Sequence, residues 1–282
     1  MHKALYREYR PLVFDDVIGQ DHIIRTLKNQ IKENSMSHAY LFCGTRGTGK
    51  TTTAKILSRA VNCQAGDQDH PCNQCSSCQS ILDSSNLDVI EIDAASNNSV
   101  DDIRELRDTV KYTPANSKYK VYIIDEVHML SQGAFNALLK TLEEPPSYVI
   151  FILATTEPNK IPATILSRCQ RFDFKRVSVG DLIDRMKLIC QSESIDIDED
   201  ALRIIARNGQ GSVRDALSIL DKCLSFGGNI LTGDQVLELL GGSDPDQLLK
   251  MAKSIMDSDV CKSMEMVEDY FMWGKDLRLL VE

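Results

Sequence analysis

The sequence predicts an α/β fold built on a parallel sheet and followed by helical domains, and three observations support this. Short apolar runs alternate with helical stretches up to about residue 176, which is the pattern of parallel strands connected by helices. A Gly-rich loop at residues 44–51 separates the first apolar run from a helix. From residue 180 to residue 240 only helical periodicity is found.

Four apolar runs are the expected strands of the sheet, and they span residues 39–43, 87–92, 121–124 and 149–154. The expected helices around them span residues 52–62, 101–112 and 131–142, with a short helical stretch at 162–166. Because the apolar runs are nearly continuous, we expect strands that are buried on both faces by helices.

Length and punctuation divide the chain into three expected domains. A chain of 282 residues is too long for one ordinary core. We expect an α/β core at residues 1–177, a small all-helical domain at 178–242 and a third, helical domain at 243–282. Gly241-Gly-Ser-Asp-Pro245 is the linker signal, and helices are expected at 247–256 and 261–282. The last helix has no stop signal, so we expect the third domain to be truncated.

Composition excludes several classes of protein. The formal net charge of −9 argues against a basic coat for nucleic acid, so any DNA contact should be local, through a few basic side chains or helix N-termini. No apolar run is long enough to span a bilayer, and residues 1–10 are too polar for a signal peptide. We therefore expect a cytoplasmic protein with no membrane contact.

A phosphate-binding loop is predicted where the first apolar run ends. The run from Gly44 to Thr51 matches the pattern G-x-x-x-x-G-K-[ST], and it stands between a strand and a helix. Its backbone N–H groups can wrap a phosphate, Lys50 can reach the β and γ phosphates of ATP, and the Thr51 hydroxyl can bind Mg²⁺. The alternative is an incidental Gly-rich turn, but such a turn would not need to lie between a strand and a helix. The expected ATP contacts are Gly44, Thr45, Arg46, Gly47, Thr48, Gly49, Lys50, Thr51 and Thr52.

Two carboxylates follow the apolar run at 121–124. Asp125 would hold Mg²⁺ through water, and Glu126 would act as general base on the attacking water. A solvated strand end is the alternative, but a phosphate loop upstream in the same chain argues against it. A protein that only binds nucleotide needs the Asp and not the Glu, so Glu126 favours hydrolysis.

Thr156 and Arg214 could read the γ-phosphate, and Arg168 stands at a helix end whose ordinary occupant is a solvated charge. Thr156, or its neighbour Thr155, ends the apolar run at 149–154, and the C-terminal ends of parallel strands meet in one crevice. Arg168 follows the short helical stretch, and Arg214 opens a helix from which it could swing onto the phosphates. In general, a Thr at a strand end is a cap, and an Arg at an exposed helix end is a solvated charge.

Four of the nine cysteines cluster in the sequence and predict a structural zinc site. Cys63, Cys72, Cys75 and Cys78 form the pattern C-x8-C-x2-C-x2-C, in which close pairs can wrap one tetrahedral ion. Four thiolates leave no open position, which is typical of a structural site. His70 is a competing ligand, and a redox pair or unrelated surface thiols are the alternatives. The expected zinc module spans about residues 62–82.

Together these features resemble the gamma/tau family of bacterial DNA polymerase III subunits over nearly the whole chain. Further segments that carry the resemblance are Leu5-Tyr-Arg-Glu-Tyr-Arg-Pro11, Phe14-Asp-Asp-Val-Ile-Gly-Gln20, Glu91-Ile-Asp-Ala-Ala-Ser96, Ile124-Asp-Glu-Val-His-Met-Leu130, Phe135-Asn-Ala-Leu-Leu-Lys-Thr-Leu-Glu-Glu-Pro-Pro146 and Ile165-Leu-Ser-Arg-Cys169. Many P-loop proteins share the phosphate loop. The zinc insert, the run ending in Glu-Glu-Pro-Pro and the Ser-Arg-Cys element are far more specific.

The resemblance implies an AAA+ core with a helical lid and a collar domain that oligomerises. It implies that Arg168 is the finger that completes the ATP site of a neighbouring subunit, that Thr156 is sensor 1 and that Arg214 is sensor 2. The opening segments correspond to the adenine pocket of the family. The contacts implied there are Tyr9, Arg10, Pro11, Val17 and Ile18.

The implied function is the ATP-driven motor of the clamp loader, with ATP, Mg²⁺ and Zn²⁺ as cofactors. Implied partners are the delta and delta-prime subunits, further copies of the chain, the beta sliding clamp and primed-template DNA. A long form would also reach the polymerase core and the helicase through a C-terminal region missing here. The family is classed under DNA-directed DNA polymerase, yet nothing in the chain resembles a polymerase active site.

Two alternatives remain open from the sequence. Another AAA+ DNA motor, of the branch-migration type, should lack the zinc insert and the Ser-Arg-Cys element. A non-hydrolysing clamp-loader scaffold would keep the fold, and the intact residues Lys50, Thr51, Asp125 and Glu126 argue against it.

Overall fold

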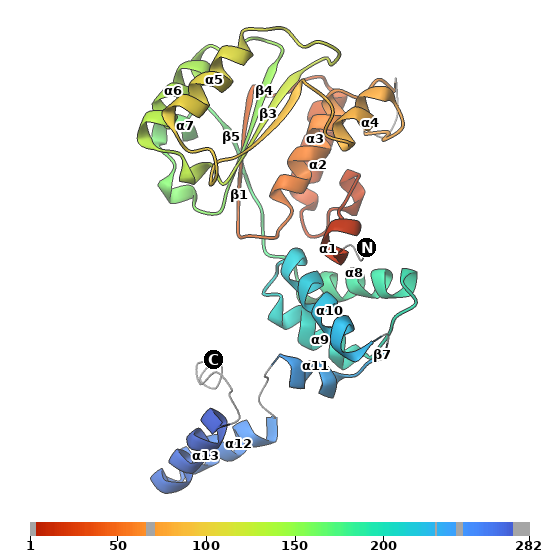
Figure 1. The fold of residues 1–282 in the computed structure, drawn as a ribbon, viewed down its shortest axis with the longest axis vertical. Helices are drawn as coiled ribbons and strands as arrows, with labels where there is room; N and C mark the ends of the chain where they lie inside the picture. Colours follow the sequence, from red (N-terminus) through yellow and green to blue (C-terminus); the bar gives the residue numbers. More distant parts are fainter. Residues whose placement is uncertain (1–3, 66–70, 229, 241–244, 273–282) are drawn as a thin grey trace. The chain divides into compact units, whose positions relative to one another are not determined.

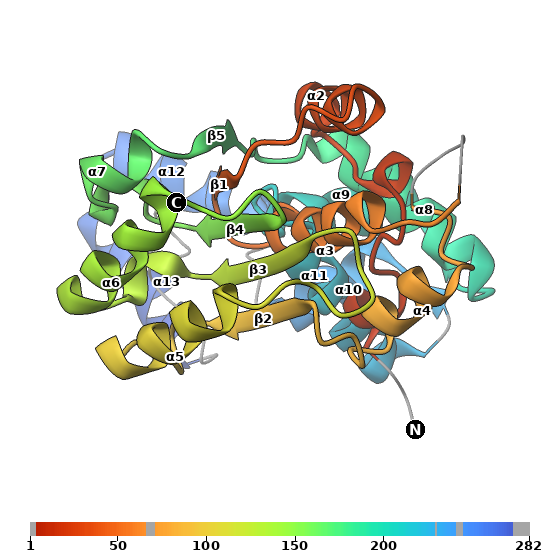
Figure 2. The same cartoon turned by 90° about the horizontal axis from the view of Figure 1, so that it is seen from above.

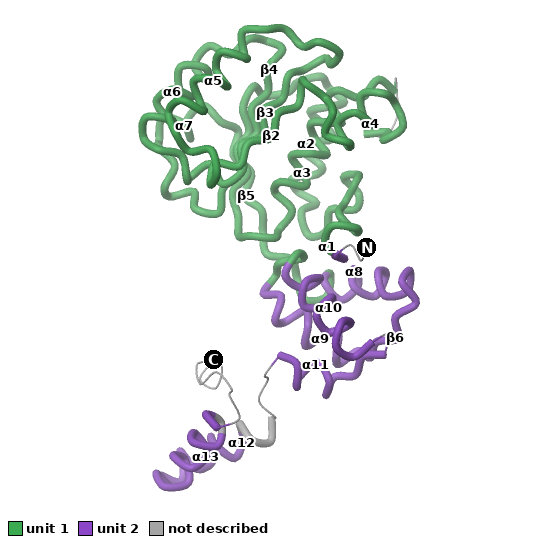
Figure 3. Tube along the Cα trace, in the orientation of Figure 1, with its two compact units in different colours: residues 1, 6–181, 211–214 green, residues 2–5, 182–210, 215–282 purple. Residues whose placement is uncertain are grey.

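The computed structural model describes residues 4–65, 71–228, 230–240 and 245–272, and it separates into two compact units (Figures 1 and 3). The first unit is built from residues 6–181 and 211–214, and the second from residues 182–210 and those after 214. Among the described residues, no helix is long and apolar enough to cross a membrane.

A five-stranded parallel sheet is the centre of the first unit. Its strands are β1 (Ala39–Cys43), β2 (Val89–Asp93), β3 (Lys120–Asp125), β4 (Val149–Thr155) and β5 (Gln170–Asp173), in the order β2-β3-β4-β1-β5 (Figure 2). All pairs are parallel, as alternation of strands and helices requires. Strand β4 therefore lies between β1, which leads into the Gly-rich loop, and β3, which ends in the two carboxylates.

Helices cover both faces of this sheet, because successive strand side chains point to opposite faces. On one face, Leu41, Ile124 and Leu153 pack against α5 (Val100–Val110), α6 (Gln132–Glu143) and α7 (Ala163–Leu166). On the other face, Phe42 and Ile123 pack against α2 (Asp21–Lys32) and α3 (Lys50–Val61). In Figure 1 the two groups of helices lie on either side of the sheet.

Local sequence explains where these helices begin. Ser99 and Asp102 form a capping box at the start of α5, in which each side chain accepts the other residue's backbone N–H. Ser131 caps α6 by accepting the N–H of Ala134 at 3.2 Å. Gly49, in the left-handed region with φ +100°, turns the chain into α3.

The first unit also contains five short elements among the described residues. They are α1 (Leu5–Glu8), η1 (Phe14–Asp16), α4 (Ser76–Leu82), η2 (Val127–Met129) and η3 (Pro158–Lys160). Within α1, Leu5 is assigned to the second unit and residues 6–8 to the first. Helix α4 is the helical part of the predicted zinc module.

The second unit is a helical bundle that is followed by a helix pair. Its helices are α8 (Val179–Ser192), α9 (Glu199–Asn208), α10 (Val213–Gly227), α11 (Gly233–Leu239), α12 (Pro245–Met256) and α13 (Val260–Met272). Buried side chains such as Met186, Ile205 and Leu220 form the bundle core. The linker residues 241–244 and the end of the last predicted helix, residues 273–282, lie outside the described residues.

Three differences from the predicted elements have physical reasons. Strand β5 escapes a search for apolar runs, because Phe172 is its one buried residue. The region from 180 to 240 is not purely helical, because β6 (Asp196–Ile197) pairs with β7 (Ile230–Leu231). Strand β2 begins at Val89 and not at Leu87, because Leu87 is 79% exposed and Asp88 turns towards a neighbouring loop.

Candidate nucleotide and metal sites

The sheet topology brings the predicted site residues to one edge. The end of β1 is aligned with the end of β4, where Cys43 pairs with Thr155. Gly44 donates its N–H to the carbonyl of Thr155 at 3.2 Å, so the loop starts directly beside β4. Strand β3 flanks β4 on its other side and ends at Asp125. The phosphate loop, the carboxylates and the end of β4 thus lie side by side at the C-terminal edge of the sheet.

The backbone of the loop requires glycine at two crowded positions. A Cβ atom on Gly44, which has φ +151°, would lie 2.6 Å from the carbonyl oxygen of Phe174. A Cβ atom on Gly47, which has φ +74°, would collide with the hydroxyl of Ser212. Gly47 also accepts the N–H of Val213 at 3.1 Å. The carbonyl of Phe174 and the side chain of Ser212 can therefore approach the loop this closely only because Gly44 and Gly47 have no side chain.

The ammonium group of Lys50 lies against the loop. The residue is 6% exposed, and Nζ donates to the carbonyls of Gly44 and Thr45, each at 2.8 Å. Burial lowers the pKa of Lys50, while the nearby carboxylates of Glu126 and Asp125 act to raise it. A buried cation with two carbonyl partners is suited to an anionic ligand, because phosphate oxygens would compensate its desolvation.

Thr51 and Asp125 form the predicted Mg²⁺-binding pair. The Thr51 hydroxyl donates to Oδ2 of Asp125 at 2.7 Å, which joins the first turn of α3 to the end of β3. Oδ1 of Asp125 accepts the N–H of Glu126 at 3.0 Å. Hard oxygen ligands of this kind, with several waters, are what Mg²⁺ prefers in phosphate sites, so the donor set fits the ion.

Glu126 and Thr156 are also brought together. Glu126 has a left-handed backbone with φ +47°, which turns its side chain back towards β4. Its Oε2 accepts the hydroxyl of Thr156 at 3.0 Å and the N–H of Thr156 at 3.3 Å. Thr156, the expected γ-phosphate sensor, thus binds the carboxylate of Glu126, the expected general base.

His128 is a site neighbour to which the sequence analysis gave no role. Its side chain is 7% exposed, and Nδ1 lies 3.4 Å from Oε2 of Glu126 and 3.1 Å from Oγ1 of Thr155. Nε2 lies 3.3 Å from Oε1 of Glu157. The signal that could have found it is its place two residues after the expected base, on the turn that leaves β3.

The predicted adenine-side residues lie along α3 and the loop. Nε of Arg10 donates to the Thr52 hydroxyl at 3.2 Å. Val17 is buried, with a methyl group 3.7 Å from where a Cβ of Gly49 would stand. Tyr9, Pro11 and Ile18 are half-buried. Arg10 and Val17 therefore lie beside the end of the loop and the start of α3.

Arg214 and Arg168 lie in different surroundings. A Cβ on Gly47 would lie 3.3 Å from Cβ of Arg214, so Arg214 stands beside the loop, with its guanidinium 5.1 Å from the ring centre of Tyr6. Arg168 donates to the carbonyl of Thr164 at 2.8 Å and to Glu143 at 2.9 Å. These bonds join Arg168 to α7 and α6, whereas Lys50, Thr51, Asp125, Glu126 and Thr156 form one cluster.

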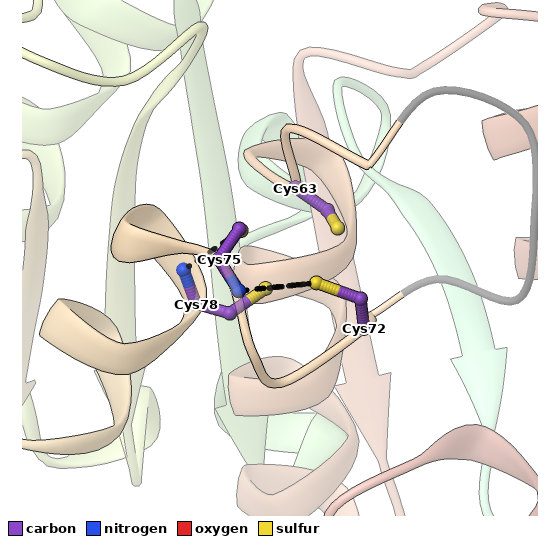
Figure 4. Close-up of side chains that lie close together, drawn as sticks. All are labelled: Cys63, Cys72, Cys75 and Cys78. Carbon is purple, nitrogen blue, oxygen red and sulfur yellow. Dashed lines mark hydrogen bonds between the residues drawn. The ribbon is translucent and has the colours of Figure 1, made fainter.

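The four clustered cysteines converge in space (Figure 4). The Sγ atoms of Cys63, Cys72, Cys75 and Cys78 all lie within 4.8 Å of one another, and those of Cys72 and Cys78 are 4.0 Å apart. Tetrahedral zinc with bonds of about 2.3 Å needs sulfurs about 3.8 Å apart, so the four thiols fit this ion after a small contraction. His70 lies outside the described residues.

Backbone amides prepare part of this cluster for a metal. The N–H groups of Gln74 and Cys75 point at Sγ of Cys72, at 3.5 and 3.4 Å, and they lower the pKa of this thiol to about 6. Burial raises the pKa of Cys78, which a bound cation would offset. The convergence of four sulfurs favours a metal over a single redox pair, which would need two.

Comparison with known proteins extends these observations. A family model described as the DNA polymerase III delta subunit matches residues 19–178, and one described as the ATPase lid domain of a DNA polymerase III clamp loader subunit matches residues 182–229. DNA polymerase III subunit tau of Bacillus subtilis is 54% identical over 281 residues, which cover 100% of this chain and 50% of that protein. Subunit gamma of Buchnera aphidicola subsp. Acyrthosiphon pisum is 43% identical over 93% of this chain and 73% of that protein. The chain belongs to the gamma/tau family of DNA polymerase III clamp-loader subunits.

This gamma/tau chain spans about half the length of the Bacillus subtilis protein. Among solved structures, the RuvB Holliday junction branch migration motor of Thermotoga maritima matches with a TM-score of 0.61 over 88% of this chain and 79% of that one, at 20% identity. Identity this low concerns the fold alone. The predicted fold class, a P-loop AAA+ core on a parallel sheet with a helical lid, is confirmed.

Proposed function

We propose that this chain is the ATP-binding and ATP-hydrolysing motor subunit of a DNA polymerase III clamp loader, which loads the sliding clamp onto primed DNA. The observation that carries the proposal is the cluster at the strand ends, where Lys50 faces the loop, Thr51 bonds Asp125 and Glu126 bonds Thr156. This cluster combines a phosphate-binding cation, oxygen ligands for Mg²⁺ and a general base. Nucleotide binding alone would not need the base.

The proposed role of each group follows from its position. The loop N–H groups and the positive end of α3 would bind the phosphates, with Lys50 between the β and γ positions. The segment at residues 9–18 would contact the adenine base, through Tyr9, Arg10, Pro11, Val17 and Ile18. Bound Mg²⁺ would supply charge neutralisation at those phosphates. Glu126 would accept a proton from the attacking water, and the Thr156 hydroxyl would orient this water or the γ-phosphate.

Arg168 is proposed to act on the ATP site of a neighbouring subunit. In its own chain the guanidinium pairs with Glu143 on α6, and its side chain is one-third exposed, so it is accessible to a partner. Arg214 is proposed to act on its own chain's nucleotide as sensor 2, because it stands beside Gly47 at the loop. The position of Tyr6 between Arg214 and Arg7 would hold the arginine there.

The proposed partners are those of a clamp loader. They are delta and delta-prime subunits, further copies of this chain, the beta clamp and primed-template DNA. We propose that residues 1–177 form the motor core, residues 178–242 the lid and residues 243–282 the start of an oligomerising collar. We expect the chain to have no polymerase active site of its own and to act in the cytoplasm, where bacterial replication takes place.

The zinc module is proposed to be structural. One Zn²⁺ would be held by Cys63, Cys72, Cys75 and Cys78, with no open position for a substrate. Its support comes from the convergence of the sulfurs and from the amides that stabilise the Cys72 thiolate.

Two alternatives are less well supported. A branch-migration motor shares the AAA+ fold at 20% identity, whereas tau subunits of Bacillus subtilis and Escherichia coli match this chain over its full length at 54% and 43% identity. A scaffold subunit without hydrolysis has no need for a base held at the end of β3, where Glu126 lies.

The test is ATP turnover by the full-length protein assembled with its partner subunits. Turnover should be slow alone and rise when sliding clamp and primed DNA are both added. A branch-migration motor would instead respond to four-way DNA junctions. A scaffold would bind ATP without turnover under any of these conditions, and either result would reject the proposal.

A further inference from the structure

The carbonyl group of Leu12 connects the cysteine module to the N-terminal segment. It accepts a hydrogen bond from Nη2 of Arg59 at 2.8 Å and another from Nδ2 of Asn73 at 3.1 Å. Arg59 lies in the last turn of α3 and is 4% exposed. Asn73 lies between Cys72 and Cys75. The carbonyl oxygen of Leu12 is thus bonded both to Arg59 on α3 and to Asn73, which lies between two of the clustered cysteines.

The position of Asn73 depends on the cysteines around it. Its backbone has φ +55°, and its own N–H points towards the thiol of Cys78. The next two N–H groups point at Sγ of Cys72. A metal bound to these sulfurs would fix this turn, and with it the direction of the Asn73 amide. Within the described residues, Oδ1 of Asn73 is buried without a hydrogen-bond partner, so its Nδ2 bond to Leu12 is what anchors the side chain.

Arg59 supplies a second link to the module. Its guanidinium is buried and its Nε has no partner among the described residues. Burial lowers the pKa of Arg59, while the nearby Cys78 acts to raise it. Four thiolates around one Zn²⁺ carry a net negative charge, which would compensate this buried cation. A bound metal would therefore affect both Arg59 and Asn73, the two side chains that bond the Leu12 carbonyl.

Leu12 stands in the middle of the segment that borders the nucleotide loop. Two residues before it, Arg10 bonds Thr52, the residue after the Mg²⁺-binding Thr51. After it, Phe14 is 1% exposed in the core and Val17 packs near Gly49. A shift of Leu12 would move Arg10 and Val17 relative to the loop, while Lys50 and Thr51 would stay in place on α3.

We propose that the metal module sets the position of residues 9–18 through the Asn73–Leu12 hydrogen bond, so that Asn73 is a positioning residue for the base side of the nucleotide site. This inference rests on the proposed function, which assigns residues 9–18 to the base. The bound metal then contributes to affinity for the nucleoside part of ATP and leaves phosphate binding by the loop unchanged.

The test compares Asn73→Gly with Ser84→Gly in the full-length protein. Both residues have a left-handed backbone, with φ +55° and +57°, which glycine adopts freely, and Ser84 is exposed. Calorimetry measures the dissociation constants of ATP and of inorganic tripolyphosphate, and metal analysis measures zinc content. Losing one hydrogen bond should weaken ATP binding about 3- to 10-fold. Tripolyphosphate affinity and zinc content should not change, and Ser84→Gly should match the wild type.

Removal of zinc by a chelator should reproduce the loss in the wild type, with faster hydrogen exchange at residues 9–18, and added zinc should reverse both. The inference is overturned if Asn73→Gly binds ATP like the wild type, loses its zinc, or loses ATP and tripolyphosphate affinity equally. A wild type that binds tripolyphosphate as tightly as ATP would instead reject the assignment of residues 9–18 to the base, which belongs to the proposed function.

Discussion

At the scale of single residues, the two charged groups expected to meet ATP are held by different means. Lys50 is buried and bonded to two loop carbonyls, which leaves a desolvated cation beside the phosphate position. Glu126 is held by Thr156 and approached by His128. Binding and hydrolysis should therefore be separable by substitution, since neither group depends on the other for its position.

Lys50→Ala should weaken ATP binding. The substitution removes a charge-assisted hydrogen bond worth about 1.5–3 kcal/mol, so the dissociation constant should rise about 10- to 100-fold. Lys55→Ala is the matched control, because Lys55 lies on the same helix but pairs with Glu91 at 2.6 Å. Fluorescent-nucleotide titration measures both. Equal effects of the two substitutions would contradict the assignment of Lys50 to the phosphates.

Glu126→Gln should preserve ATP affinity and stop turnover. The amide oxygen can still accept from Thr156, but the side chain no longer accepts a proton, a function commonly worth about 10²–10⁴ in rate. The rate is measured by phosphate release in the full assembly with clamp and primed DNA. Wild-type turnover in this variant would remove Glu126 from the role of base.

At the scale of elements, a buried carboxylate fixes the loop before β3. Asp88 is 3% exposed and accepts the N–H groups of Ala115, Asn116 and Ser117 at 2.9, 2.9 and 3.0 Å. Burial acts to raise the pKa of Asp88, but these donors outweigh it and lower the pKa below its usual value. The carboxylate thus stabilises the fold above its unfolded pKa of about 3.9, and this contribution is lost as pH falls through the lower folded pKa.

Asp88→Asn should therefore destabilise the protein by about 1.5–3 kcal/mol at pH 7, because hydrogen bonds to a charged acceptor are lost. The difference from the wild type should begin to shrink below about pH 4, where the carboxylate of the unfolded chain becomes protonated, and should disappear as pH falls through the lower folded pKa. Urea denaturation at pH 7 and pH 3 measures it. A difference that does not change between these pH values would show that charge is not what stabilises the loop.

The zinc module should contain about one Zn²⁺ per chain. Cys75→Ser should lower zinc affinity by at least about 100-fold, the loss that even outer-shell changes can cause, and should destabilise α4 locally. Tripolyphosphate binding at the loop should survive. Cys261→Ser is the control, because this thiol is exposed and outside the cluster. Zinc-free wild-type protein, purified under reducing conditions, would reject the site.

The sequence allowed prediction of the elements whose signals are local. The apolar runs gave β1, β3 and β4 to within a residue or two, and the P-loop pattern located α3. Strand β5 was missed because an edge strand with one buried residue has no apolar run. Helix α2 was not assigned, although Ile23, Ile24 and Leu27 show helical spacing. Contacts such as Asn73 with Leu12 could not be predicted, since they join residues 61 positions apart through a backbone oxygen.

At the scale of the whole molecule, the proposed function places the chain beside neighbouring subunits of a clamp loader. Arg168 pairs with Glu143 in its own chain, and its proposed function is in the next subunit. The isolated chain should therefore bind ATP and hydrolyse it slowly, because a finger arginine commonly contributes on the order of 10³ or more in rate. Arg168→Ala should leave the ATP affinity of the isolated chain nearly unchanged.

The most direct measurement is ATP turnover in mixed assemblies of two inactive variants, Arg168→Ala and Glu126→Gln. In a mixed assembly, an Arg168→Ala chain keeps its Glu126, and a neighbouring Glu126→Gln chain can supply the intact Arg168. We therefore expect partial recovery of the ATP turnover that clamp and primed DNA stimulate. Mixing Arg168→Ala with a chain that carries both substitutions is the control and should stay inactive. No recovery in any mixture, together with a large loss of ATP affinity in isolated Arg168→Ala, would show that Arg168 serves its own site and would contradict the account.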